Sequence, residues 1–510
     1  MYKIITVLFL SLFITMQINA RILPKEGSKL HYRLIGFSFP DEPQNGKYKL
    51  EIADGYFNQA DSFKKNIINS TTGKKNKIIA EVPAFGKQYT WRVVFAGGNE
   101  ASGTLHHFST TIIPFADTNV TRLRITKRAE KNKDAYVFLD GARALYDMNG
   151  RPVWYLPDIE GLMNESTLLC DLKITNRGTI TFMLRDRCAF EINYNSDVIW
   201  RGPNNSILSK YIHYHHEFTR LSNGHYMILG TEPLLWKHRQ PAADDSSLYV
   251  FSDGKTGPEN KDTAYKMFPF GTMIEYDEKG NVVWEWKTSE YVKECDLKYY
   301  APPNGGNGFD VHVNAFFFDE KDKTIYLSFR DINRIIKIKY PEGTVLNTYG
   351  ERYKRGFSET GKGLFCGQHS CRRSEKGYLY LYNNNVCSKD GSLPNIIMMQ
   401  EAVSENGNLN KVWEYECTLD GLNEKTLPGA GYTSGGNVIE MPDHSLFVSM
   451  SSPYGKIFMV SPGKDILWSA VSEQWNRYEK KWQMLPLYRA SIINSRNDLE
   501  HLIWNEEIKE

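Results

Sequence analysis

A short phrase in which an aliphatic residue precedes a tryptophan recurs along most of the chain. Its copies are centred on Trp154, Trp200, Trp284, Trp413 and Trp468, with a degenerate copy at Asn347. Successive copies lie 46, 84, 63, 66 and 55 residues apart. Repeats of this length suit one four-stranded blade of a β-propeller, with loops of variable length between the strands.

A second phrase, a polar turn followed by a strand of alternating apolar residues, recurs in the same region. It occupies residues 221–230, 319–329, 374–384 and 441–452. An array of β-sandwiches would need each unit to close its own core, whereas single sheets with one large aromatic residue each pack better face to face around an axis. We therefore predict an all-β fold with a six-bladed β-propeller over residues 113–510. A weakly amphipathic helix is predicted near its end, at residues 472–490.

The segments ahead of the propeller have a different character. Residues 1–20 combine Lys3, a short apolar run and a small residue at Ala20, which is typical of a secretory signal peptide. An uncleaved membrane anchor is the less favoured alternative, because a spanning helix needs about 20 apolar residues. Residues 21–112 contain short alternating stretches that predict a small N-terminal β-sandwich domain. We therefore expect an exported protein without stable membrane insertion.

Charge and cysteine content narrow the classes of partner. The net charge is +2, from 62 basic and 60 acidic residues. This balance argues against nucleic-acid binding and against membrane binding through a polybasic surface. Seven cysteines in an exported chain favour disulfides, and the odd number leaves at least one thiol unpaired.

Histidines occupy similar places in successive repeats. They are His213, His215 and His216 in the first of these repeats, His312 in the next and His369 in the third. His216, His312 and His369 each precede the polar turn of their repeat by six to eight residues, and Thr433, Ser434 and Asn437 take the equivalent place in the last. Equivalent positions in successive blades point at one axis. We therefore expect these side chains to converge on the channel of the propeller.

Three of these stretches, read in order on a chain with a signal peptide, resemble the bacterial arylsulfate sulfotransferases. The stretches are YHHEFTRLSNGHYMIL at 214–229, DVHVNAFFFDEKDKTIYLSFRDINRIIKI at 310–338 and GQHSCRRSEKGYLYLYNNN at 367–385. The resemblance implies a six-bladed propeller with an appended β-sandwich, a periplasmic location and a homodimer. It also implies transfer of a sulfuryl group from a phenolic sulfate ester to a phenolic acceptor through a sulfated histidine. No cofactor is expected: the family does not use the nucleotide donor PAPS, and the chain has no glycine-rich phosphate-binding loop.

Residue by residue, the resemblance assigns a role to each matching position. It implies His369 as the nucleophile and His216, His312 and Arg330 as further catalytic residues. Asn314, His215, Thr433 and Ser434 are implied to bind substrate, with His215 as the alternative to His216 within the histidine pair. The resemblance also implies a short disulfide near the site, for which Cys366 and Cys371 are the candidates, and a periplasmic helper for its formation.

These residue types suit sulfuryl transfer on chemical grounds as well. Like phosphoryl transfer, the reaction passes through a loose transition state, so the protein mainly positions the group and neutralises charge on its oxygens. Arg330 and Asn314 can do this through charged and amide hydrogen bonds. A neutral imidazole is a competent nucleophile near neutral pH, because its reference pKa is about 6.5. We favour His216 for proton transfer and His312 for contact with the sulfuryl oxygens.

Each assignment has a plainer alternative. A histidine before a strand is often structural, Arg330 can pair with Asp331 or Glu320, and Asn314 can be a turn residue. Zinc bound by Cys366, Cys371 and His369 would lack a fourth ligand, so no metal is expected.

Two other functions remain open at this stage. One is a non-catalytic propeller that binds glycans, which would not need the histidines to converge. The other is a propeller lyase or hydrolase acting on acidic polysaccharide, for which we would expect a more basic chain.

Overall fold

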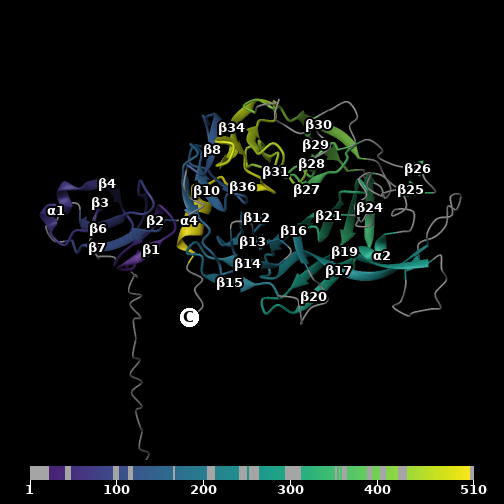
Figure 1. Cartoon of the computed structure of the whole chain (residues 1–510), viewed down its shortest axis with the longest axis horizontal. Coiled ribbons are helices and arrows are strands. Elements are labelled where there is room, and N and C mark those ends of the chain that lie inside the picture. Colours follow the sequence, from purple (N-terminus) through teal and green to yellow (C-terminus); the bar gives the residue numbers. More distant parts are fainter. Residues whose placement is uncertain are drawn as a thin grey trace, which may run out of the picture. The chain divides into compact units, whose positions relative to one another are not determined.

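The computed structural model describes most of the chain as two compact units, Met1–Thr111 and Ile112–Glu510 (Figure 1). The described residues are 22–40, 47–95, 103–112, 119–164, 167–185, 187–203, 213–239, 250–251, 263–292, 312–350, 353–354, 357–358, 364–386, 393–401, 409–422 and 433–505. The predicted signal peptide, residues 1–20, lies outside them.

The described residues of the first unit form two β-sheets and one short helix, α1 (Ala60–Lys65). The larger sheet has the order β1 (Ser28–Leu30), β7 (His106–Thr110), β6 (Gln88–Phe95), β3 (Tyr48–Asp54) and β4 (Ile67–Gly73). The smaller sheet pairs β2 (Leu34–Ser38) with β5 (Lys77–Glu81). Phe37 of β2 packs edge-on against Trp91 of β6, with 5.1 Å between ring centroids. Both rings are buried, so the two sheets share one core, as a small β-sandwich requires.

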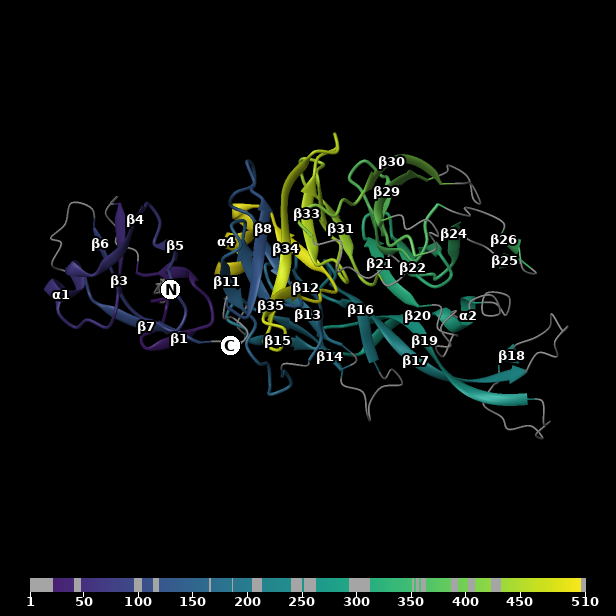
Figure 2. The same cartoon turned by 45° about the horizontal axis from the view of Figure 1, so that its top comes forward.

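The described residues of the second unit form six antiparallel sheets of four or more strands and one separate two-stranded sheet. The first large sheet has the order β36 (Ala490–Ile493), β9 (Tyr136–Leu139), β10 (Ala144–Asp147) and β11 (Pro152–Tyr155). The second has the order β12 (Leu169–Ile174), β13 (Ile180–Leu184), β14 (Cys188–Ile192) and β15 (Val198–Arg201). The third has the order β16 (His213–Arg220), β17 (Tyr226–Arg239), β19 (Thr263–Tyr276) and β20 (Val282–Lys287), with β18 (Val250–Phe251) beside β17. Figure 2 shows β17 and β19 as one long hairpin that extends past the rest of its sheet. The short helix α2 (Thr288–Tyr291) follows β20.

The other three sheets continue the same up-and-down pattern. The fourth sheet has the order β21 (Val313–Asp319), β22 (Thr324–Phe329), β23 (Arg334–Lys339) and β24 (Val345–Gly350). The fifth has the order β27 (His369–Arg373), β28 (Leu379–Asn383), β29 (Asn395–Gln400) and β30 (Asn410–Glu416). The sixth has the order β31 (Asn437–Glu440), β32 (Leu446–Ser449), β33 (Lys456–Val460), β34 (Ile466–Asn476) and β35 (Lys481–Met484), with β8 (Thr121–Lys127) beside β34. A separate two-stranded sheet pairs β25 (Tyr353–Lys354) with β26 (Phe357–Ser358), and α4 (Arg496–Trp504) ends the described chain.

The first strand of each sheet contacts the first strand of the next. The order is β36, β12, β16, β21, β27 and β31, and it returns to β36 through β32. Figure 1 shows these strands around a common centre within the second unit. The all-β prediction is confirmed, and this cyclic order is the arrangement that the six-bladed interpretation requires.

The repeated tryptophans link the fourth strand of one sheet to the next sheet. The indole N–H groups donate to backbone carbonyls in this way from Trp154 to Tyr194, from Trp284 to Pro341, from Trp413 to Pro462 and from Trp468 to Met148, at 2.7–3.0 Å. Trp200 instead stacks on Tyr226 with 3.9 Å between ring centroids. In the degenerate copy, Asn347 donates to the Tyr349 hydroxyl, which donates to Glu401 in the fifth sheet. The repeat therefore marks the joints between sheets.

The helix predicted over residues 472–490 is wrong. This stretch forms the end of β34, a turn and β35, and Trp475 pairs directly with Trp482 across the hairpin. Their rings make an edge contact at 5.6 Å, and Arg122 of β8 lies 3.9 Å over the Trp482 ring. Pairing with neighbouring strands outweighs the weak helical periodicity here. No helix in the described part of the chain is long and apolar enough to cross a membrane.

We expect Trp468→Phe to destabilise the second unit. Trp468 is fully buried, so the substitution removes the donor to the Met148 carbonyl and leaves a small cavity. The expected loss is about 2–4 kcal/mol in the free energy of unfolding, measured by chemical denaturation. Trp284→Phe is the matched control: its indole makes the equivalent bond at an exposed joint and should lose less. Equal losses in the two variants would contradict this account of the repeat.

Candidate functional site

The first strands of four neighbouring sheets share a bulge near their starts. The register of strand pairing shifts between residues 170 and 173 in β12, 214 and 218 in β16, 313 and 315 in β21, and 369 and 372 in β27. A non-glycine residue with positive φ lies at or next to each shift: Asp171 (58°), His216 (65°), His312 (55°) and Ser370 (53°). A left-handed conformation costs an L-residue roughly 1–2 kcal/mol. Two of the predicted histidines therefore occupy strained positions, as is common where side chains are aimed at a functional site.

The histidines of the third and fourth sheets form a hydrogen-bonded chain. Nε2 of His215 lies 3.2 Å from the Gly230 carbonyl, and Nδ1 of His215 lies 2.6 Å from Nδ1 of His216. Nε2 of His216 lies 3.1 Å from Nε2 of His312. The Gly230 carbonyl can only accept, so His215 donates to it. His216 then donates from Nδ1 to His215 and accepts at Nε2 from His312.

Burial keeps His215 and His216 neutral. Desolvation, and then the neighbouring His312, lowers the pKa of His215 to about 3. Desolvation and the adjacent His215 and His312 hold the pKa of His216 well below its ordinary value. Both rings can therefore accept a proton only against an electrostatic cost, and both keep the single-proton form that the chain of hydrogen bonds requires.

Asp331 joins His312 to the predicted arginine. One carboxylate oxygen lies 3.6 Å from Nδ1 of His312, and the other accepts a hydrogen bond of 2.7 Å from Arg330. Burial opposes ionisation of Asp331, but the hydrogen bond and charge of His312 and the charge of Arg330 outweigh it, and the pKa is lowered. Arg330 thus makes the ion pair that the plainer alternative foresaw. It also lies close enough to His369 to lower the pKa of that imidazole.

His369, at the start of β27, is 2 % exposed. Its Nδ1 lies 2.6 Å from Oδ1 of Asn384 and 3.2 Å from the Gly367 carbonyl. Two oxygen acceptors at Nδ1 place the ring proton there, so Nε2 carries the lone pair. Desolvation and the charges of Arg330 and His312 hold the pKa of His369 well below its ordinary value. Among the described residues, Nε2 has no hydrogen-bond partner.

The predicted substrate-binding residues lie beside these histidines, but they use their polar groups differently. Asn314 is fully buried and donates from its amide to the Gln368 carbonyl at 2.7 Å, which ties the fourth sheet to the fifth. The Thr433 hydroxyl is buried and donates to the Asn384 carbonyl at 3.3 Å. Ser434 is exposed and bridges to Ser452 through its backbone. Of these three residues, Thr433 is the one whose side chain contacts Asn384, the hydrogen-bond partner of His369.

The predicted pairing of Cys366 with Cys371 is wrong. Cys371 is a free, buried thiol, whereas Cys366 is disulfide-bonded. Cys371 lies inside β27, and its sulfur contacts the Tyr326 carbonyl of the neighbouring sheet at 3.7 Å. The Cys371 side chain thus packs in the core between two sheets. Cys366 lies outside β27, before its first residue. Burial also raises the pKa of the Cys371 thiol to about 12, which makes it unreactive.

Sequence reasoning missed a buried ion cluster beneath the histidines. Arg489, just before β36, donates to Asp171 at 2.9 Å, to Glu217, and to the Asn314 carbonyl at 3.2 Å. Lys173 donates to both carboxylates, at 2.7 and 3.1 Å. Burial alone would raise the pKa of Glu217, but the charge of Arg489 and its other cationic neighbours lowers it to about 2. Glu217 is therefore ionised and paired within the cluster.

Tyr488, next to Arg489, was also missed. Its ring lies edge-on to His216 at 5.5 Å and to His369 at 6.4 Å, between centroids. Its hydroxyl faces the Asn314 carbonyl at 3.4 Å. Asp140 fixes this segment by accepting from the backbone N–H groups of Tyr488 and Arg489, at 3.1 and 2.7 Å. No motif marks these residues in the sequence, because they reach the site through the pairing of the last strand with β9.

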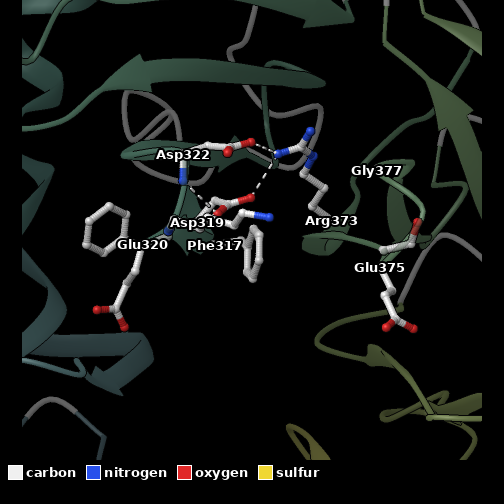
Figure 3. A pocket seen from close by; sticks show the side chains of 10 residues that line it. Phe317, Asp319, Glu320, Asp322, Arg373, Glu375 and Gly377 are labelled. Carbon is white, nitrogen blue, oxygen red and sulfur yellow. Dashed lines mark hydrogen bonds and ion pairs between the residues drawn. The ribbon is translucent and has the colours of Figure 1, made fainter.

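A separate pocket of about 430 Å³ lies at the other end of the same strands (Figure 3). Its wall includes Asp319 and Asp322 beside Arg373, which donates to Asp319 at 2.9 Å and also to Asp322. His312 and His369 stand at the starts of β21 and β27, whereas this pocket is built on the turns that follow those strands. It is therefore distinct from the histidine cluster. Within the described residues, no group of His, Cys, Asp and Glu side chains is arranged to hold a metal ion.

Comparison with known proteins gives one family match. Residues 270–416 match the family model described as Arylsulfotransferase (ASST). The matched segment contains His312, Asn314, Arg330 and His369. No curated protein matches the chain.

Several solved structures resemble the chain at low similarity. A protein from Bacteroides caccae has 10 % identity and a TM-score of 0.41, covering 71 % of this chain and 98 % of its own. Apo AztD from Citrobacter koseri has 8 % identity and a TM-score of 0.31, covering 88 % and 98 %. An auxiliary nutrient binding protein from Bacteroides thetaiotaomicron has 8 % identity and a TM-score of 0.32, covering 88 % and 84 %. These values are too low to assign a fold or a function.

We expect the buried histidines to make stability depend on pH. In the unfolded chain His215 takes up a proton near its ordinary pKa of about 6.5, but in the folded protein it does so near 3. The unfolded state therefore binds more protons below about pH 6.5, and stability falls as the pH is lowered. His215→Gln should reduce this slope by up to about 1.4 kcal/mol per pH unit between pH 6 and 5, measured by urea denaturation.

The control for this measurement is His501→Gln, which removes an exposed imidazole from α4. Because the slopes are compared between variants, a loss of absolute stability in either does not affect the result. A slope in His215→Gln that equals that of the parent protein would show that His215 is not held neutral by burial.

Proposed function

Because residues 270–416 carry an arylsulfotransferase family domain, we propose that this protein transfers a sulfuryl group from a phenolic sulfate ester to a phenolic acceptor through a sulfated His369. The observation that carries the proposal is the hydrogen bonding of His369. Both oxygen contacts fall on Nδ1, so the unprotonated Nε2 is available to attack sulfur. The two half-reactions then follow a ping-pong order.

In the first half-reaction, the Nε2 lone pair of His369 forms a bond to sulfur. The bond between sulfur and the phenolic oxygen breaks, and its electron pair leaves with the phenolate. Arg330 is suited to the developing charge on the sulfuryl oxygens, because its ion pair with Asp331 holds the guanidinium in place near His369. Little covalent work is left to the protein beyond positioning and charge neutralisation.

The departing phenolate needs a proton, and the incoming phenol must lose one. His312 suits this exchange, because its Nε2 lies 3.1 Å from Nε2 of His216, which stays neutral and orients the His312 ring, and Asp331 lies beside that ring. In the second half-reaction the acceptor oxygen bonds to sulfur, the N–S bond breaks, and its electron pair returns to Nε2. The proton given to the first phenol is recovered from the second, so the site returns to its starting state.

Export completes the proposal. The disulfide at Cys366 suits an oxidising compartment such as the periplasm, to which a signal peptide would direct the chain. A periplasmic helper for forming this disulfide and a homodimeric assembly belong to the same proposal.

The test is intact mass of the purified protein after incubation with a chromogenic phenyl sulfate and no acceptor. We expect a gain of one sulfuryl group with release of one equivalent of phenol, and discharge of the group when an acceptor phenol is added. His369→Ala should show neither event, whereas His501→Ala, at an exposed site on α4, should behave as the parent protein. A parent protein with no mass gain and no phenol release would overturn the proposal and favour a glycan-binding or polysaccharide-cleaving propeller.

A further inference from the structure

Asn384 makes the shortest polar contact to His369. It follows β28 directly, is fully buried, and places Oδ1 2.6 Å from Nδ1 of the imidazole. It is the middle of three consecutive asparagines, residues 383–385. Its neighbours face elsewhere: Asn383 accepts from the backbone of Cys366, and Asn385 donates to the Leu393 carbonyl.

Contacts with the sixth sheet's leading loop fix the orientation of the Asn384 amide. Its nitrogen Nδ2 donates to the Gly435 carbonyl at 3.1 Å, and this carbonyl can only accept. The amide therefore cannot turn its nitrogen toward His369 without losing that bond, so its oxygen faces Nδ1. The backbone carbonyl of Asn384 also accepts from the Thr433 hydroxyl, which holds the residue from a second side.

We propose that Asn384 is a positioning residue that keeps the proton of His369 on Nδ1 and thereby presents the Nε2 lone pair to the sulfur of the ester. The inference rests on the proposed function and names a residue that serves it without touching substrate. A fixed partner on one ring nitrogen is the ordinary way in which a protein selects the reactive nitrogen of a histidine.

The absence of charge on the Asn384 amide is as important for the protonation of His369 as the position of the amide. The neighbouring Arg330 and Arg489 are cations, and with His312 they lower the pKa of His369, while Tyr488 faces the imidazole with its ring. A carboxylate in place of Asn384 would oppose these cations and favour a doubly protonated imidazole, which has no lone pair to attack sulfur. An amide accepts the same hydrogen bond without adding that charge.

The same contact serves the second half-reaction. Once Nε2 is bonded to sulfur, the ring keeps its Nδ1 proton and carries a positive charge. The N–S electron pair then returns to a ring that becomes neutral, which makes His369 a good leaving group when the acceptor oxygen attacks. No additional proton or co-reactant is needed at His369 in either half-reaction.

The experiment is a pH titration by NMR of protein labelled with ¹⁵N in its histidines, with His369→Gln used to assign the His369 signals. In the parent protein we expect the proton on Nδ1 of His369. Asn384→Asp should raise the pKa of His369 by about 1–3 units, as an opposite charge in direct contact does. Asn385→Asp is the matched control, since it makes the same substitution one residue along, and His369 should titrate there as in the parent.

Two results would overturn the inference. One is a proton on Nε2 of His369 in the parent protein, which decides the matter even when Asn384→Asp fails to fold. The other is an unchanged titration of His369 in a folded Asn384→Asp variant. Neither readout depends on activity, so each is separable from failure of the proposed function, which would show as a parent protein that is never sulfated.

A kinetic measurement connects the titration to the reaction. In Asn384→Asp the rate of phenol release in a single turnover should fall as the pH is lowered. The midpoint pH of this fall should lie about 1–3 pH units above that of the parent protein, in agreement with the NMR titration. A purely structural role would instead lower the melting temperature and leave the midpoint of the pH profile in place. That outcome would also contradict the inference.

Discussion

The pairing of β36 with β9 is the interaction on which the second unit depends. It joins residues 490–493 to residues 136–139 in antiparallel register and so completes the first sheet with the last strand that the structure describes. Asn437 adds to this joint by exchanging hydrogen bonds with the backbone of Ala490, which links the sixth sheet to the first. In this cyclic order each of the six larger sheets of the described residues has a neighbour on either side.

Closure also delivers residues to the site. Tyr488 and Arg489 precede β36 directly, and Asp140 holds their backbone N–H groups. Arg489 then pairs with Asp171 and Glu217 from the second and third sheets, so one cation ties three sheets together at the centre. Breaking one member of such a buried set leaves an uncompensated charge, which is strongly destabilising. The ion cluster and the histidines above it are thus parts of one construction.

Burial lowers the pKa of the buried histidines more than any single neighbouring residue does. Desolvation is the largest cause of the low pKa of His215, His216 and His369. Neutral rings can pass protons and donate lone pairs, and the oxygen acceptors at Nδ1 of His369 decide which nitrogen does so. Bulges near the starts of the strands, with His216 and His312 in left-handed conformation, bring the rings of these two residues together, with their Nε2 atoms 3.1 Å apart.

Much of this fold could be predicted because its signals are local and repeated. The tryptophans mark the fourth strands of five sheets, and the polar turns mark the first hairpins of four sheets, so the repeat gives sheet boundaries without knowledge of long-range contacts. The failures have long-range causes. Trp475 and Trp482 form a hairpin that pairs with β8, and Cys371 turns into the core between two sheets. Likewise, no sequence rule selects Asn384 from three adjacent asparagines as the partner of His369.

The stereochemistry of transfer at sulfur tests the central claim most directly. A phenyl sulfate made chiral at sulfur with oxygen isotopes would be used as donor, and the configuration of the product ester determined. Transfer through His369 consists of two in-line displacements, each inverting sulfur, so the account predicts net retention. Net inversion would mean direct transfer between donor and acceptor in a single displacement, and would contradict a covalent role for His369.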